Sequence, residues 1–187
     1  MGMPAEITEW TADMARALPD DGMRYEVLDG QLAVTPAPSW DHQRVVTALW
    51  RRLDEYLRPL GIAEALCAPA DVEFSPRRLV QPDIFVIPRR PGEVRPREWS
   101  DVKSLLLAVE VLSPTSARRD RIAKRAIYQA EGVSDYWIVD LDARVIERWR
   151  IGDERPEILA NSIVWQPHAE QPPLVVDLLP LFTESLE

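Results

Sequence analysis

The chain has 187 residues, of which 46% are hydrophobic and 28% charged, so we expect one domain over residues 1–187 with a substantial core. The formal net charge of −9 argues against a protein that holds nucleic acid by its general surface, but it leaves room for a local basic cleft. A single cysteine excludes an internal disulfide, and because no apolar run could cross a bilayer and no secretion signal opens the chain, we expect a cytoplasmic protein without a membrane partner.

The N-terminal third predicts a β-hairpin between two helices. Residues 6–17 are expected to form a short helix. Two runs of alternating hydrophobicity, 23–28 and 31–35, flank Asp29-Gly30, a dipeptide that favours a tight turn. Apolar residues then recur at helical spacing from about 40 to 58, which predicts a long amphipathic helix.

The middle of the chain predicts three strands and a helix. Strand-like runs cover about 63–74 and 79–87, and a nearly continuous apolar run at 104–112 predicts a central strand covered on both faces. Residues 116–131 are expected to form a helix that ends at Gly132 in a left-handed cap. The segments "DYWIVD" and "VIERWR" then predict a hairpin, followed by a further strand and a closing segment.

One carboxylate interrupts the predicted central strand. Glu110 lies within "LLLAVEVLSPTS", and a carboxylate at the end of a buried strand is costly unless it is paired, hydrogen-bonded or bound to a metal. Asp83, in "VQPDIFVI" of the preceding strand, is the candidate partner if the two strands are neighbours. A divalent cation between them would remove their repulsion, and oxygen ligands favour Mg²⁺ or Mn²⁺.

Lys124 is the third candidate. It lies at the border of the apolar face of the predicted helix, with Asp120 one turn before it and Tyr128 one turn after it. Its ammonium could reach the sheet edge and stabilise negative charge during phosphodiester hydrolysis, while the metal polarises the phosphate and generates hydroxide. A simple ion pair with Asp120 is the alternative.

Several segments carry a family resemblance: "YEVLDGQLA", "PDIFVI", "LAVEVLSPTS" and "RDRIAKRAIYQAEGVSDYWIVD". Over about residues 18–182 the chain resembles the Uma-type restriction endonucleases of the PD-(D/E)XK nuclease superfamily. The resemblance implies the α/β (α+β) class, with a restriction-endonuclease-like core in which a mixed β-sheet is flanked by helices, and an added N-terminal β-hairpin. It also implies a divalent metal held by Asp83, Glu110 and the main-chain carbonyl of Val111.

The position of the lysine departs from the wider superfamily. The superfamily usually has a lysine two residues after the second acid, where this chain has Leu112. In the Uma-type pattern the lysine comes from the following helix, which matches Lys124. Glu26 and His42 also match recurrent family positions and are second-tier site residues. Without the resemblance, we would expect Glu26 to be exposed to solvent and His42 to lie in the first turn of its helix without a functional role.

The segment "ARRDRIAKR" is the clearest basic patch. Its residues Arg118, Arg119 and Arg121 form either a solvated helix face or a set of phosphate contacts. The aromatic residues of "DYWIVD" and "VIERWR" resemble base-stacking residues, but their apolar neighbours favour core or dimer packing.

These residues and the family resemblance together imply an Mg²⁺- or Mn²⁺-dependent endonuclease that cleaves DNA, and cleavage of both strands leads us to expect a homodimer. Two other classes remain open. A catalytically inactive module of nuclease fold is favoured by the acidic surface and by Leu112 in place of a lysine. A metal-dependent hydrolase of a small phosphoester would suit a negatively charged protein with a small polar site.

Overall fold

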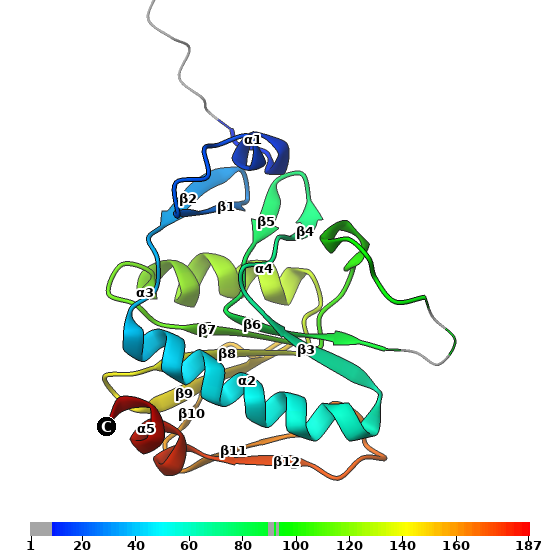
Figure 1. Ribbon diagram of the computed structural model, residues 1–187, viewed down its shortest axis with the longest axis vertical. Helices are drawn as coiled ribbons and strands as arrows, with labels where there is room; N and C mark the ends of the chain where they lie inside the picture. The colour runs from blue at the N-terminus through cyan, green and yellow to red at the C-terminus, as the bar shows by residue number, and fades with distance from the viewer. Residues whose placement is uncertain (1–8, 90–91, 93) are drawn as a thin grey trace, which may run out of the picture.

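A six-stranded mixed sheet forms the centre of the protein in the computed structural model, which describes residues 9–89, 92 and 94–187 (Figure 1). Its strands β7 and β8 are parallel, and its other neighbours are antiparallel. In spatial order the strands are β10 (Glu157–Leu159), β9 (Val145–Arg150), β8 (Asp135–Asp140), β7 (Leu107–Val111), β6 (Ile84–Pro88) and β3 (Ala63–Cys67). The predicted mixed sheet and the β8–β9 hairpin are confirmed.

Helices cover both faces of this sheet (Figure 1). One face packs against the long helix α2 (Trp40–Leu60), the C-terminal helix α5 (Leu178–Leu186) and the ribbon of β11 (Ser162–Trp165) and β12 (Leu174–Asp177). The other face packs against α4 (Arg125–Ala130), which continues from α3 (Ala117–Arg119) through the π-helical turn η2 (Asp120–Lys124). Within the described ranges, no helix combines the length and apolar character needed to span a bilayer.

The central strand β7 divides its residues between these two faces, as a fully covered strand must. Leu107, Val109 and Val111 belong to the core shared with α2 and α5. Ala108 belongs to the core shared with α4, and Glu110 points to that same side because successive side chains alternate. The aromatic residues of β8 are also buried in the two cores, so the expected core packing is confirmed.

The N-terminal hairpin belongs to a second sheet. Asp29 and Gly30 have φ angles of 50° and 84°, as a tight two-residue turn requires. The sequence predicts the hairpin as a separate addition to the core, but its strand β1 also pairs with β5, so the hairpin is part of a larger sheet. In spatial order the second sheet contains β2 (Gln31–Thr35), β1 (Arg24–Leu28), β5 (Arg78–Val80) and β4 (Val72–Ser75).

Three predicted elements differ from the structure in extent. The helix expected at 6–17 is the short α1 (Ala12–Arg16), capped by Thr11, and residues 6–8 lie outside the described part of the chain. The strands expected at 63–74 and 79–87 are each divided between the two sheets. Both divisions contain a proline, which has no N–H group to donate to a strand ladder. As a result, Asp83 lies where the chain passes from the second sheet into the central one.

Candidate active site

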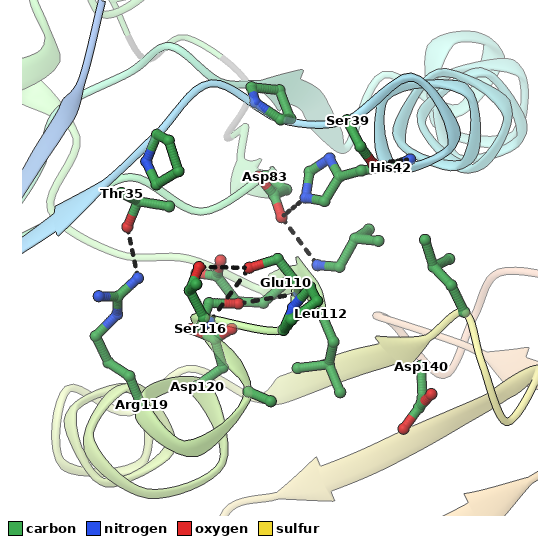
Figure 2. Close-up of a pocket in the computed structure, with 18 of the residues that line it drawn as sticks. Thr35, Ser39, His42, Asp83, Glu110, Leu112, Ser116, Arg119, Asp120 and Asp140 are labelled. Carbon is green, nitrogen blue, oxygen red and sulfur yellow. Dashed lines mark hydrogen bonds and ion pairs between the residues drawn. The ribbon is translucent and has the colours of Figure 1, made fainter.

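A cavity of about 580 Å³ lies where β7 ends, and Asp83, Glu110 and Lys124 all line it. Figure 2 shows Asp83 and Glu110 at this cavity. Because β6 and β7 are antiparallel and Ile84 pairs with Val109, Asp83 and Glu110 lie opposite each other at one end of the sheet. The structure therefore brings together the two carboxylates that the sequence predicts to be neighbours. The first hairpin, the start of α2 and the helix that follows β7 supply further walls.

Asp83 is buried and surrounded by hydrogen-bond donors. Its Oδ1 accepts a bond from Arg24 Nη1 at 2.7 Å, and its Oδ2 accepts bonds from the Val111 N–H at 2.9 Å and from His42 Nε2 at 3.0 Å. Burial by itself would raise the pKa of Asp83. The bond and charge of His42 and the charge of Arg24 outweigh burial and lower this pKa to about 2. Asp83 is therefore an ionised carboxylate at neutral pH.

Glu110 and Lys124 form the buried centre of the cluster. Glu110 Oε1 accepts bonds from Lys124 Nζ and from the Tyr128 hydroxyl, each at 2.9 Å. Burial raises the pKa of Glu110 well above its usual range; the charge of Lys124 opposes this shift, but neighbouring carboxylates add to it. Burial would lower the pKa of Lys124, yet the surrounding carboxylates outweigh it and raise this pKa. Lys124 is therefore charged at neutral pH.

Glu26 is part of this cluster, so the expectation that it is solvated is wrong. Its side chain is 2% exposed, and its Oε1 lies 2.8 Å from Lys124 Nζ and accepts a bond from the Gln81 N–H at 2.7 Å. Arg24, two residues earlier in β1, points to the same side and reaches Asp83. Sequence reasoning missed Arg24, although its i,i+2 spacing from Glu26 was the available signal. The hairpin thus contributes two site residues.

The helix after β7 adds a carboxylate that sequence reasoning regarded only as an ion-pair partner. Asp120, Lys124 and Tyr128 recur at one-turn intervals, and all three are buried. Asp120 Oδ1 lies 3.9 Å from Lys124 Nζ, which is too far for a hydrogen bond. Burial raises the pKa of Asp120, although the charge of Lys124 opposes the shift. The spacing of these residues was a usable signal for a helix face with buried polar groups.

The three arginines of the basic patch have different environments. Arg118 is exposed and lies outside the set of cavity-lining residues, so its predicted phosphate contact at this site is not supported. Arg121 lines the cavity but bonds to Glu147 at 2.7 Å and to Asp140 at 2.9 Å. Arg119 also lines the cavity and donates to the Thr35 hydroxyl, and no carboxylate of the described residues forms an ion pair with it.

The chemistry of these donors suits a hard divalent cation. No group of three His, Cys, Asp or Glu side chains in residues 9–89, 92 and 94–187 is arranged to hold an ion. Mg²⁺ does not need such a cage, because it is usually bound by one or two carboxylates together with water and substrate phosphates. The Val111 N–H points to Asp83, and the carbonyl of an extended residue points to the same side as its N–H, so this carbonyl is expected near Asp83 as well.

The balance of charge also fits such an ion. Four buried carboxylates contribute to the cavity wall, whereas among the described residues only Lys124 and the partly buried Arg24 form lysine or arginine ion pairs with them. Asp120 Oδ1 is buried and has no hydrogen-bond partner among the described residues. These carboxylates therefore outnumber the lysine and arginine side chains that pair with them, and Asp120 Oδ1 remains without a hydrogen bond, with Arg24 and Lys124 as competitors of an added cation.

Comparison with known proteins identifies the family. The family described as "Uma2: Putative restriction endonuclease" matches residues 12–180. A crystal structure of "a putative nuclease belonging to DUF820" from Anabaena variabilis is similar at a TM-score of 0.74 and 20% identity, over 94% of this chain and 99% of that chain. This likeness confirms the nuclease-like fold, and a search of curated proteins finds no match. Because the family match extends over most of the sequence, the chain belongs to the Uma2 family of restriction-endonuclease-like proteins.

Proposed function

We propose that the protein is an endonuclease that hydrolyses phosphodiester bonds in DNA with the help of Mg²⁺ or Mn²⁺. The observation that supports this function is the buried pair of Asp83 and Glu110 at the ends of adjacent strands, with the Lys124 ammonium 2.9 Å from Glu110. Buried clusters of titratable groups in a cavity tend to mark functional sites. Membership of the Uma2 family favours nuclease chemistry over other uses of such a cluster.

In this proposal Asp83, Glu110 and the carbonyl of Val111 hold the cation. When it is bound, the cation polarises a phosphate and makes a water molecule a stronger nucleophile at neutral pH. Arg24 and His42 keep Asp83 ionised and fix its orientation through their bonds to its two oxygens. The protein thus provides a preformed anionic ligand before any cation arrives.

Lys124 has the complementary task. Its ammonium is buried, fixed by bonds to two carboxylates and charged at neutral pH, so it can stabilise negative charge that develops on the phosphate. Arg119, which has no carboxylate partner in the described part of the chain, would contact a neighbouring phosphate. Because the net charge is −9, such local cations would have to attract DNA against the field of the whole molecule.

We further propose that the active form is a cytoplasmic homodimer, since cleaving both strands of a duplex normally requires two sites. Light scattering coupled to size-exclusion chromatography measures this directly. A measured molecular mass near 21.4 kDa at the assay concentration would show that the protein is a monomer. A monomer has one site, so we would then expect it to nick one strand only.

Incubation of supercoiled plasmid with Mg²⁺ or Mn²⁺ tests the function. We expect nicking or linearisation that EDTA abolishes and that Asp83→Asn and Glu110→Gln each reduce by at least about 100-fold, as is typical when a group that stabilises transition-state charge is lost. Asp142→Asn is the matched control, because this exposed carboxylate lies at the cavity rim. Cleavage that persists in both active-site variants would contradict the proposal.

One observation favours a catalytically inactive module instead. Both oxygens of Asp83 already accept bonds from protein donors, including the Arg24 guanidinium. If these bonds are never released, no cation can bind, and titration with Mn²⁺ will show no binding at all. Turnover of bis(p-nitrophenyl) phosphate without plasmid cleavage would indicate the third class, a hydrolase of small phosphoesters.

A further inference from the structure

Asp120 presents a buried carboxylate oxygen that accepts no hydrogen bond from any described residue. Its side chain is 1% exposed, it lines the cavity, and its Oδ1 has no hydrogen-bond partner among the described residues. A buried charged oxygen without a partner is costly, and in native proteins such a group usually indicates a bound water, an ion or a catalytic role. The position of Asp120 therefore requires a physical explanation beyond packing.

The local backbone strengthens this argument. Asp120 begins the π-helical turn Asp120–Lys124, and single π-turns within α-helices occur frequently at functional sites. Within this turn Asp120 and Lys124 are buried, whereas the apolar Ile122 is 55% exposed. A helix that served packing alone would show the opposite distribution. The turn thus places Asp120 and Lys124 in the interior and leaves the side chain of Ile122 exposed to solvent.

The described neighbours of Asp120 hold it in place without a hydrogen bond to Oδ1. The Tyr136 hydroxyl donates to the Asp120 main-chain carbonyl at 3.1 Å, which fixes the backbone. Lys124 bonds to Glu26 at 2.8 Å and to Glu110 at 2.9 Å but remains 3.9 Å from Asp120 Oδ1. Figure 2 shows Asp120 on the helix beside Glu110, at the wall of the same pocket.

We propose that Asp120 Oδ1 contacts the divalent cation through one water molecule, and that the π-turn presents this oxygen to the cavity. This inference rests on the proposed function, since it assigns Asp120 to the cation that Asp83 and Glu110 would hold. Mg²⁺ usually keeps several of its water molecules, and Asp120 Oδ1 can accept a hydrogen bond from one of them because no protein donor bonds to this oxygen in the described residues.

Calorimetric titration of the full-length protein with Mn²⁺ alone, without DNA, tests the inference. We expect Asp120→Asn to weaken the Kd for Mn²⁺ by at least about 10-fold, the range found when groups around a metal are replaced. Asp142→Asn should stay within about 2-fold of the wild type, because it removes the same charge from the cavity rim. Asp120→Glu, which keeps a carboxylate, should bind more tightly than Asp120→Asn.

Thermal unfolding in EDTA separates a binding effect from a folding effect. Asp120→Asn should unfold at the wild-type temperature or above it, because it removes like charge near Glu110 and Glu26. The temperature shift that Mn²⁺ produces should shrink in this variant. Wild-type Mn²⁺ affinity in a folded Asp120→Asn protein would overturn the inference alone. Absence of Mn²⁺ binding in the wild type would overturn the proposed function with it.

Discussion

The two faces of the central sheet achieve burial in different ways. On the α2 side, Leu107, Val109 and Trp137 pack in a continuous apolar core. On the α4 side, the apolar core gives way at the end of β7 to the cluster around Glu110 and Lys124. Apolar contacts depend on shape and area, whereas buried charges depend on having each partner present. The energetics of the two faces should therefore respond differently to substitution and to added cations.

The largest effect should come from Lys124→Met, which keeps a long side chain but removes the ammonium. Glu26 and Glu110 would then be buried without their cation, and losing one partner of a buried ion pair typically costs about 3–5 kcal/mol. Urea unfolding in EDTA measures this change in the free energy of unfolding. A loss below about 0.5 kcal/mol, the range of ordinary surface substitutions, would show that water already hydrates the cluster.

Leu53→Ala provides the contrast on the α2 side. Leu53 is fully buried in the apolar core, and the cavity left by this substitution should cost about 3 kcal/mol. Mn²⁺ should restore part of the stability of Lys124→Met, since a divalent cation can replace the missing charge, but it should bring Leu53→Ala no gain beyond that of the wild type. Equal responses of the two variants to Mn²⁺ would remove the distinction between the faces.

The fold was largely predictable because hydrophobic periodicity records which faces are buried. The hairpin at Asp29-Gly30, the long helix α2 and the central strand β7 all follow from local pattern and turn chemistry. The divided strands did not follow, because a run such as 63–74 has one pattern while its two halves belong to different sheets. Sheet membership depends on pairing partners far away in sequence, which local pattern does not encode.

The candidate site was predictable in part. Asp83 and Glu110 were recognisable because carboxylates in apolar strands are conspicuous, and the register of β6 and β7 brings them together. Glu26 and Arg24 were harder to assign, since a polar residue on a hairpin strand usually faces water. Their burial depends on the second sheet lying against the end of β7, a tertiary contact. The burial of Asp120 was hidden for the same reason, because its spacing from Lys124 also suits a surface ion pair.

Arg24→Met should have an intermediate effect on stability. It removes a charged bond to buried Asp83, which keeps its contacts with His42 and Val111, so we expect a loss of about 2 kcal/mol. The same change should increase Mn²⁺ affinity, because the guanidinium competes with a cation for Asp83 Oδ1. Unfolding in EDTA and calorimetric titration measure the two effects.

Arg16→Met is the control for this variant. Arg16 forms ion pairs with Asp71 and Glu73 at the more exposed part of the second sheet, where such pairs are worth no more than about 1 kcal/mol. Its loss should leave Mn²⁺ affinity unchanged. If Arg24→Met lowers Mn²⁺ affinity instead, the guanidinium organises the ligand rather than competing with the cation.

The smallest effect on stability should come from Arg119→Ala, which tests whether the cavity wall contacts phosphate. Arg119 forms no ion pair within the described residues, so its loss should change the free energy of unfolding by less than about 0.5 kcal/mol. Binding of duplex DNA should weaken, and the dependence of log K on log salt should lose about one unit of slope, as expected for one phosphate contact.

Arg118→Ala removes the same charge from an exposed position next to Arg119 and should leave this slope nearly unchanged. Equal slopes for the two variants would mean that DNA responds to the overall charge of the helix, and the cavity wall would then have no specific phosphate site.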